Sequence, residues 1–243
     1  MRGIVLVAGR GRRLGELGSQ QPKCLASLRG KTLLSRTIEV LRETGVEDIA
    51  LVTGYRRDLL TSFGLHEFYN SDWSTSNMVY SLIHATPWLM KSDCVVSYGD
   101  IFYRPSAVRA LLDADGDVSL TYDPEWVKLW SLRSEDPLAD AETFRLRSNG
   151  TVCEIGRKPQ SILEVEGQYM GLLKFTPRGW SDLLSGSVTL GLDLRSVSMT
   201  EMLQAMIERR SMKVVARPYF ESWGEVDTEA DLAVYESSEF HLL

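Results

Sequence analysis

Short apolar runs alternate with helical patterns along the first half of the chain. Four runs have the length and composition of buried strands: residues 3–7, 49–52, 94–97 and 118–121. Between the first two, Thr32 can cap a helix whose apolar residues recur every 3.6 positions and which stops near Gly45. Residues 77–89 have the pattern of another helix. Such alternation predicts an α/β, Rossmann-like fold with a mostly parallel sheet covered by helices.

The second half has a different pattern. Phe144–Arg147 and Val152–Ile155 flank Asn149-Gly150, a preferred two-residue turn, and therefore predict a β-hairpin. Three further elements are expected after it: a strand at 168–175, a helix at 199–209 and a strand at 213–219. Residues 123–143 are rich in Asp, Glu, Pro and Trp and predict a long functional loop. With no repeat and no flexible linker, we expect one domain over residues 1–243, its later part adding a hairpin and lid layer.

Composition and charge exclude several classes of protein. A hydrophobic content of 44% and a charged content of 25% are typical of a globular chain and exclude disorder. The net charge of −6 argues against a non-specific nucleic-acid binder, yet it permits a small anion held by local basic residues. Three scattered cysteines and three unpaired histidines argue against disulfides and zinc. No apolar run is long enough to cross a membrane, so we expect a cytoplasmic protein.

A glycine loop bearing three arginines follows the first strand directly. Gly9 and Gly11 let backbone N–H groups close on phosphate oxygens, and the side chains of Arg10, Arg12 and Arg13 can neutralise them. The spacing fits no Walker loop, and Leu14 stands where a dinucleotide-binding loop needs a third glycine. The loop therefore predicts a phosphate site of another type, and a solvated turn with incidental arginines is the alternative.

A lysine in Gln21-Pro22-Lys23-Cys24-Leu25 precedes an apolar segment shortly after this loop. The two stretches together resemble the nucleotidyltransferases that couple a phosphorylated acceptor to an NTP and release pyrophosphate. Their signature is a strand, then Ala-Gly-x-Gly-x-Arg-Leu, then Pro-Lys-x-Leu. It is matched at Ala8, Gly9, Gly11, Arg13, Leu14, Pro22, Lys23 and Leu25. The resemblance implies the nucleotide-diphospho-sugar transferase fold, with a nucleotide-binding half at about 1–122 and an acceptor or lid half at about 123–243.

Two aspartates stand where this family holds its metal. Asp100 ends the buried strand in Ser97-Tyr98-Gly99-Asp100, and Asp227 lies in Trp223-Gly224-Glu225-Val226-Asp227-Thr228 before a helix. The resemblance implies that both bind Mg²⁺, a cation that prefers carboxylate and phosphate oxygens. A turn at Asp100 and a helix N-cap at Asp227 are the alternatives.

The resemblance also implies roles in nucleotide binding. Arg13 is expected on the β- and γ-phosphates and Lys23 on the α-phosphate, with the backbone of Gly9, Arg10, Gly11 and Arg12 around the triphosphate. Residues expected around the base are Leu6, Ala8, Gly54, Tyr55, Ser76 and Asn77. Ser76 is also placed to cap the following helix, which is the alternative.

Later segments are similar to the cytidylyltransferases that act on phosphocholine or phosphonates. They include Thr75–Leu82, Tyr98–Ile101 and Gly167–Gly171. This branch implies transfer of CMP from CTP to a phosphonate, such as 2-aminoethylphosphonate, or to phosphocholine. Sugar-nucleotide enzymes commonly continue the loop with Pro-Leu-Thr, whereas this chain has Gly15-Glu16-Leu17. A sugar-1-phosphate nucleotidyltransferase using UTP or dTTP is the alternative, and a catalytically silent nucleotide sensor is another.

Candidate acceptor residues gather in the expected loops. Aromatic rings favour a choline or aminoalkyl cation, and carboxylates can pair with an amine. The aromatic candidates are Tyr80, Tyr103, Trp126, Trp130, Tyr169 and Trp223, and the acidic candidates are Asp136, Asp140 and Glu142. Arg157 and Lys158 are candidates for binding the anionic group of the acceptor. The alternative is that the tryptophans anchor a long loop and the charges lie on its solvated face. Apolar residues in Phe240-His241-Leu242-Leu243 permit a homodimer.

Overall fold

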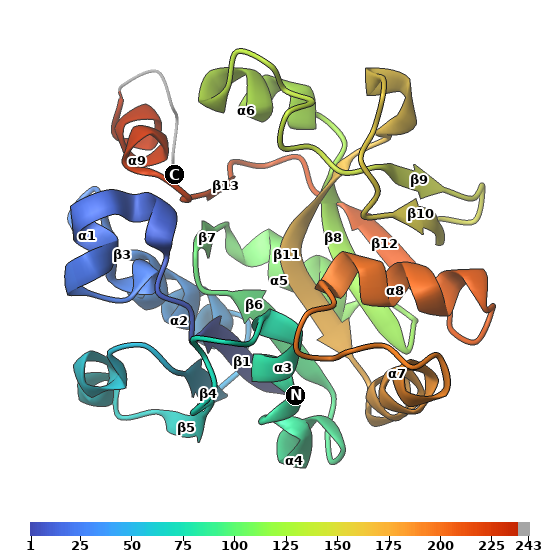
Figure 1. The fold of residues 1–243 in the computed structure, drawn as a ribbon, viewed down its shortest axis with the longest axis horizontal. Coiled ribbons are helices and arrows are strands. Elements are labelled where there is room, and N and C mark those ends of the chain that lie inside the picture. The colour runs from blue at the N-terminus through green and yellow to red at the C-terminus, as the bar shows by residue number, and fades with distance from the viewer. Residues whose placement is uncertain (238–243) are drawn as a thin grey trace.

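A computed structural model describes residues 1–237 of the protein. Its centre is a seven-stranded sheet in the order β12-β8-β11-β6-β1-β4-β5 (Figure 1). These strands are β1 (Arg2–Val7), β4 (Asp48–Thr53), β5 (His66–Tyr69), β6 (Cys94–Tyr98), β8 (Val118–Asp123), β11 (Gln168–Phe175) and β12 (Val214–Pro218). All pairs are parallel except those of β11, which is antiparallel to both β6 and β8. The expected mostly parallel, mixed sheet is confirmed.

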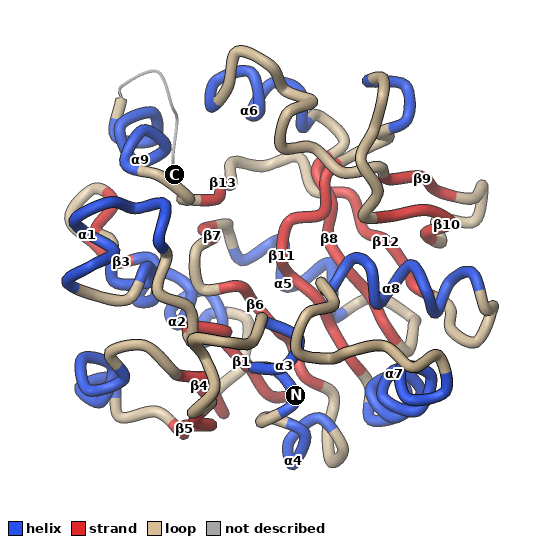
Figure 2. The backbone as a smooth tube through the Cα atoms, viewed as in Figure 1, coloured by secondary structure: helices blue, strands red, loops and turns tan. Residues whose placement is uncertain are grey.

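Helices cover both faces of this sheet, as Figure 2 shows. They are α1 (Gly15–Gln20), α2 (Leu33–Glu43), α3 (Met78–Ile83), α4 (Thr86–Leu89), α5 (Pro105–Leu112), α6 (Trp126–Arg133), α7 (Pro177–Thr189), α8 (Met199–Glu208) and α9 (Glu229–Glu236). Val5 and Val7 of β1 face one apolar core, and Ile4 and Leu6 face the other. Burial on both faces explains why the strands are continuously apolar.

Small two-stranded pairs complete the chain. The hairpin expected around Asn149-Gly150 is formed by β9 (Phe144–Leu146) and β10 (Val152–Ile155). Two further pairs join β2 (Ser27–Leu28) to β3 (Lys31–Thr32), and β7 (Ile101–Phe102) to β13 (Gly224–Glu225). Among residues 1–237, no helix has the length and apolar character needed to cross a membrane.

Two sequence-based expectations about helices were wrong. Residues 77–89 form two helices, α3 and α4, because Pro87 has no N–H group for the carbonyl of Ile83. The stretch 123–143 is not a loop throughout, since it contains α6. Trp126 and Trp130 lie one turn apart on α6 and are both buried, so tertiary packing forms a helix that the polar composition concealed.

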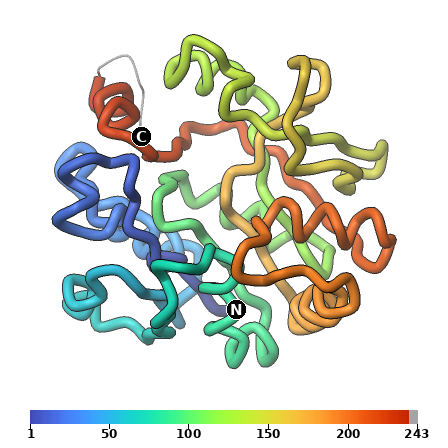
Figure 3. The backbone as a smooth tube through the Cα atoms, viewed as in Figure 1, coloured from blue at the N-terminus to red at the C-terminus, as the bar shows by residue number. Residues whose placement is uncertain are grey.

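The pairing of β7 with β13 positions the site. Gly224 lies opposite Phe102 and Glu225 opposite Ile101, so a late segment of the chain is attached directly after β6. Figure 3 shows this segment returning to the N-terminal half of the chain. The carboxyl ends of β1, β4 and β6 lie at the same edge, because these strands are parallel. Ligands of open α/β sheets bind at this edge.

Candidate active site

Three carboxylates meet at the carboxyl end of β6. Asp100 follows β6, Glu225 belongs to β13, and Asp227 lies just before α9; an oxygen of each lies within 4.8 Å of the others. Asp227 is not the N-cap of α9, which was the alternative for it. Thr228 caps that helix in a reciprocal pair with Asp231, so the Asp227 carboxylate faces the cluster.

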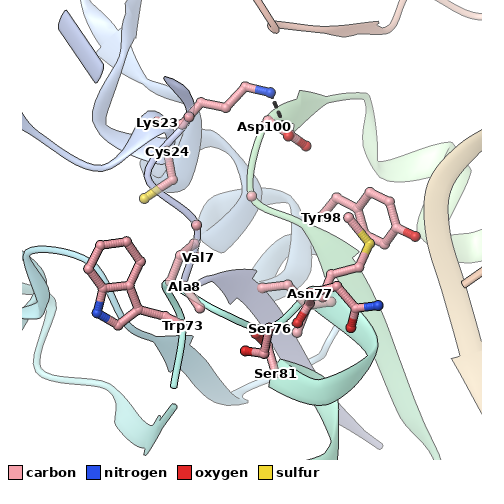
Figure 4. A pocket seen from close by; sticks show the side chains of 15 residues that line it. Val7, Ala8, Lys23, Cys24, Trp73, Ser76, Asn77, Ser81, Tyr98 and Asp100 are labelled. Carbon is pink, nitrogen blue, oxygen red and sulfur yellow. Dashed lines mark hydrogen bonds and ion pairs between the residues drawn. The ribbon is translucent and has the colours of Figure 1, made fainter. Parts of the chain in front are cut away.

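Lys23 pairs with two members of this cluster. Its Nζ lies 2.7 Å from Asp100 Oδ2 and 2.5 Å from Asp227 Oδ1, and Figure 4 shows the first of these ion pairs. Burial by itself would lower the pKa of the ammonium group, but the neighbouring carboxylates hold that pKa above its ordinary value. Lys23 is therefore charged and is the main counter-ion of the cluster.

Two arginines also bind Asp227. Arg13 Nη2 lies 2.9 Å from Asp227 Oδ1, and its guanidinium group is largely exposed. The side chain of Arg133 on α6 is only 7% exposed; its Nη2 lies 3.3 Å from Asp227 Oδ2 and its Nε lies 2.8 Å from Asp231 Oδ1. Arg133 thus orients Asp227 Oδ2, and Asp227 Oδ1 faces Lys23.

The cluster has the donor chemistry of a magnesium site. Asp100 Oδ1 is buried and has no hydrogen-bond partner among the described residues. Burial, together with the charges of Asp100 and Asp227, raises the pKa of Glu225 well above its ordinary value. Converging carboxylates that repel each other fit a hard divalent cation, which binds oxygen and completes its shell with phosphate and water.

A pocket of about 250 Å³ lies beside this cluster, between the glycine loop and the residues before α3 (Figure 4). Its lining includes six of the residues expected at the nucleotide, together with Lys23 and Asp100: Leu6, Ala8, Gly9, Gly11, Ser76 and Asn77. Ser76 does not cap α3, because the cap is the next residue: Asn77 Oδ1 accepts a hydrogen bond from the Tyr80 N–H. Trp73 also lines the pocket, although nothing in the sequence pattern singled it out.

The other residues expected at the nucleotide do not line this pocket. Arg10 and Arg12 are exposed, and the Arg10 guanidinium lies over the ring of Tyr55. Gly54 is not in the pocket wall, but it contacts a residue that is: a Cβ at position 54 would lie only 2.5 Å from the Cβ of Trp73. Gly54 therefore allows Trp73 to approach the strand edge.

A second pocket of about 360 Å³ lies on the other side of the carboxylates. The two pockets share Asn77, Met78 and Tyr98, and the second also has Glu225 and Asp227 in its wall. The expected acceptor residues found here are Trp130, Asp140, Glu142 and Tyr169. Arg13 also lines this pocket rather than the first, which differs from the expected contact with the β- and γ-phosphates.

Several expected acceptor residues do not reach either pocket. Trp126 is buried in the core, where its indole N–H donates to the Val165 carbonyl. Tyr80 packs under the Arg195 guanidinium. Lys158 donates to the carbonyls of Leu138 and Ala139. The other four are Tyr103 and Trp223, which are buried, Arg157, which pairs with Glu208, and Asp136, which accepts from the Leu138 N–H.

Comparisons with known proteins decide the family. The model of the MobA-like NTP transferase domain matches residues 3–152. This chain belongs to the MobA-like NTP transferase family. It is 34% identical to the CTP:phosphoglutamine cytidylyltransferase of Campylobacter jejuni, over 96% of this chain and 98% of that protein. It is 32% identical to the choline-phosphate cytidylyltransferase of Streptococcus pneumoniae, over 40% of this chain and 42% of that protein.

A solved structure agrees with this assignment. The inositol-1-phosphate CTP transferase of T. maritima superimposes with a TM-score of 0.75, covering 97% of this chain and 93% of that one, at 22% sequence identity. At that identity the likeness establishes the fold. The expected nucleotidyltransferase class and the nucleotide-diphospho-sugar transferase fold are confirmed.

Gly9 of this NTP transferase offers a test of the glycine loop. A Cβ at Gly9 would meet no atom within 4 Å, so Gly9→Ala should leave the thermal unfolding temperature within about 2 °C of the wild type. We expect the KM for the nucleotide to rise about tenfold, because the methyl group would stand where the phosphates approach the backbone. Steady-state kinetics and thermal unfolding measure the two effects.

Gly45→Ala is the matched control, since Gly45 ends α2 away from both pockets at a φ of +82°. It should lower the unfolding temperature and leave the nucleotide KM unchanged. An unchanged nucleotide KM in Gly9→Ala would contradict the phosphate-binding role of the loop.

Proposed function

We propose that this protein transfers CMP from CTP to a small phosphorylated or phosphonate acceptor that carries a cationic nitrogen, and releases pyrophosphate. One observation carries the proposal: two pockets meet at a cluster of three carboxylates, and Lys23 pairs with two of them at the junction. A donor nucleotide in the first pocket and an acceptor in the second would bring two anions together there.

Asp100, Glu225 and Asp227 would hold Mg²⁺, which when bound neutralises the phosphate charge that opposes this approach. Both the buried, unpartnered Asp100 Oδ1 and the mutual repulsion of the carboxylates support this assignment. Glu225 is a third candidate ligand, besides the two expected from the sequence.

The chemical step needs positioning and charge neutralisation rather than a strong base. The acceptor oxygen is already anionic when it attacks the α-phosphorus, and the bond to pyrophosphate breaks in line with it. Lys23 and Arg13 bring two positive charges to the junction where negative charge moves from the attacking to the leaving oxygen. The backbone around Gly9 and Gly11 supplies N–H groups for the triphosphate.

The walls of the second pocket support a cationic acceptor. Asp140 and Glu142 line it, and Arg13 is the one basic side chain among the described residues of the lining. Trp130, Tyr98 and Tyr169 add aromatic surface, with the two tyrosine rings meeting edge-on at 5.8 Å. Carboxylates and aromatic rings together suit an ammonium group.

The names of three relatives support the same class. They include enzymes named for phosphoglutamine, choline phosphate and 3-aminopropylphosphonate, each of which bears a nitrogen beside its phosphorus group. A sugar-1-phosphate nucleotidyltransferase is the second candidate, since a UTP–glucose-1-phosphate uridylyltransferase is 33% identical over 25% of this chain.

Pyrophosphate release tests the proposal. Each of four NTPs is combined with Mg²⁺ and one acceptor: phosphocholine, 2-aminoethylphosphonate, a carboxylated phosphonate, phosphoglutamine or a hexose 1-phosphate. Release with CTP and one nitrogen-bearing acceptor is the expected result. Release with UTP or dTTP and the hexose phosphate alone would overturn it.

Glu142 provides a test of the acceptor pocket alone. Its carboxylate is half-buried and accepts a hydrogen bond from Thr200 Oγ1, and burial raises its pKa. Glu142→Gln keeps the shape and removes the charge, so the acceptor KM should rise tenfold to about a hundredfold while the CTP KM stays unchanged. Asp136→Asn, an exposed acid of the same segment outside the pocket, is the matched control and should change neither.

A further inference from the structure

A fully buried asparagine lies behind the first pocket, immediately after β5. Asn70 Nδ2 lies 3.0 Å from Ser76 Oγ and 3.0 Å from Ser81 Oγ. Asn70 Oδ1 accepts a hydrogen bond of 2.9 Å from the Asp72 N–H. Because a backbone N–H group can only donate, this bond fixes the orientation of the amide, and the NH₂ group must face the two serines.

Each serine hydroxyl is fixed in turn. Ser76 Oγ donates its proton to the Asp72 carbonyl at 2.8 Å, and Ser81 Oγ donates to the Asn77 carbonyl at 3.0 Å. A hydroxyl group has one proton and two acceptor positions. The proton goes to a carbonyl and one acceptor position receives an Asn70 N–H, so each oxygen keeps one acceptor position.

Both serines line the pocket, and Figure 4 labels them together at the same end of it. The two serine hydroxyls therefore offer two hydrogen-bond acceptors and no donor to a ligand at that end of the pocket. An amino group of the ligand satisfies both oxygens. A carbonyl in the same place would face two lone pairs, unless a serine hydroxyl turned and gave up its own hydrogen bond to the Asp72 or Asn77 carbonyl.

We propose that Asn70 is a specificity-determining positioning residue, which holds Ser76 and Ser81 as paired acceptors that read the 4-amino group of cytosine. Uracil and thymine present an oxygen at that position. The inference rests on the proposed use of CTP and adds how UTP is rejected. Asn70 acts through the serines, since its side chain is itself fully buried.

Nucleotide binding by calorimetry tests this without any acceptor. The ligands are CTP, UTP and the triphosphate of a pyrimidin-2-one nucleoside, which has hydrogen in place of the 4-amino group. The wild type should bind CTP at least about tenfold more tightly than either of the others. Asn70→Ala should reduce both preferences to about threefold or less, chiefly by weakening CTP binding.

Ser76→Ala and Ser81→Ala are the second set of variants, in case Asn70→Ala does not fold. Each should lower the preference for CTP by about threefold to tenfold. Ser187→Ala is the matched control, because Ser187 is fully buried in α7 and donates to the Leu183 carbonyl. It should keep the wild-type preference, even if its unfolding temperature falls.

The outcomes separate the inference from the proposed function. A wild type that prefers CTP, with unchanged preferences in the folded Asn70 and serine variants, overturns the inference alone. A wild type that binds UTP as tightly as CTP overturns the proposed nucleotide, and the inference with it.

Discussion

Lys23→Met is expected to lower kcat/KM by a hundredfold to about a thousandfold. Methionine keeps much of the length and packing of the side chain but removes the charge that lies between Asp100 and Asp227. Without it, the charge that develops on the phosphate oxygens has no counter-charge at this place. Steady-state kinetics with the best acceptor measure the loss, and Lys128→Met, an exposed lysine of α6, should retain full activity.

A second readout separates this electrostatic role from simple damage. The Lys23→Met variant keeps all three carboxylates but loses the positive charge between them. Its unfolding temperature in EDTA should therefore fall below that of the wild type. Added Mg²⁺ should then stabilise the variant more than it stabilises the wild type, because the cation replaces the lost charge. Full turnover in Lys23→Met would contradict the role given to this lysine.

Asp100→Asn should also lower kcat by about a thousandfold, through a different route. The substitution keeps the shape of the side chain but removes one charge from the carboxylate cluster. The variant should fold, since Asp100 Oδ1 has no hydrogen-bond partner among the described residues and the amide oxygen of asparagine can still accept from Lys23 Nζ in place of Oδ2. The increase in unfolding temperature that Mg²⁺ gives the wild type should disappear.

Asp123→Asn gives the opposite pattern and serves as the control. Asp123 is also buried, but it accepts from the Trp223 indole and the Glu125 N–H and lies outside the cluster. The Asp123→Asn variant loses one of these hydrogen bonds, so its free energy of unfolding should fall by about 1–3 kcal/mol. Its response to Mg²⁺ should be that of the wild type. A normal Mg²⁺ response in Asp100→Asn would remove that residue from the proposed metal site.

The strands and the phosphate loop could be predicted because their signals are local. Runs such as 3–7 and 94–97 are apolar on both faces, and the glycines of the loop precede Pro22-Lys23 at a recognisable spacing. Asp100 and Asp227 were expected from the family resemblance, the first at the end of a buried strand and the second just before a helix. Helix α6 could not be predicted from the sequence, because it depends on the tertiary burial of two tryptophans rather than on a regular pattern of polar and apolar residues.

The missed residues depend on contacts between distant segments. Glu225 is two positions before Asp227, but it joins the carboxylates only because β13 pairs with β7 directly after Asp100. Arg133 and Asn70 carried no local signal, since the first reaches Asp227 from α6 and the second acts from behind the pocket. Their roles are visible only once the fold brings the partners together. A homodimer and a cytoplasmic location stay predictions, and residues 240–243 lie outside the described part of the chain.

The position of β11 has a consequence for the order in which the chain can be assembled. It lies between β6 and β8, although it follows both in the sequence. During synthesis these two strands leave the ribosome first. Until residues 168–175 emerge, β6 has one edge without its final partner and β8 has neither partner, because β12 comes later still. A fragment that stops at residue 152 would keep those edges bare and should aggregate rather than fold. The part of the chain up to residue 152 therefore depends on the later part to complete the sheet, and truncation there should not yield an independent module.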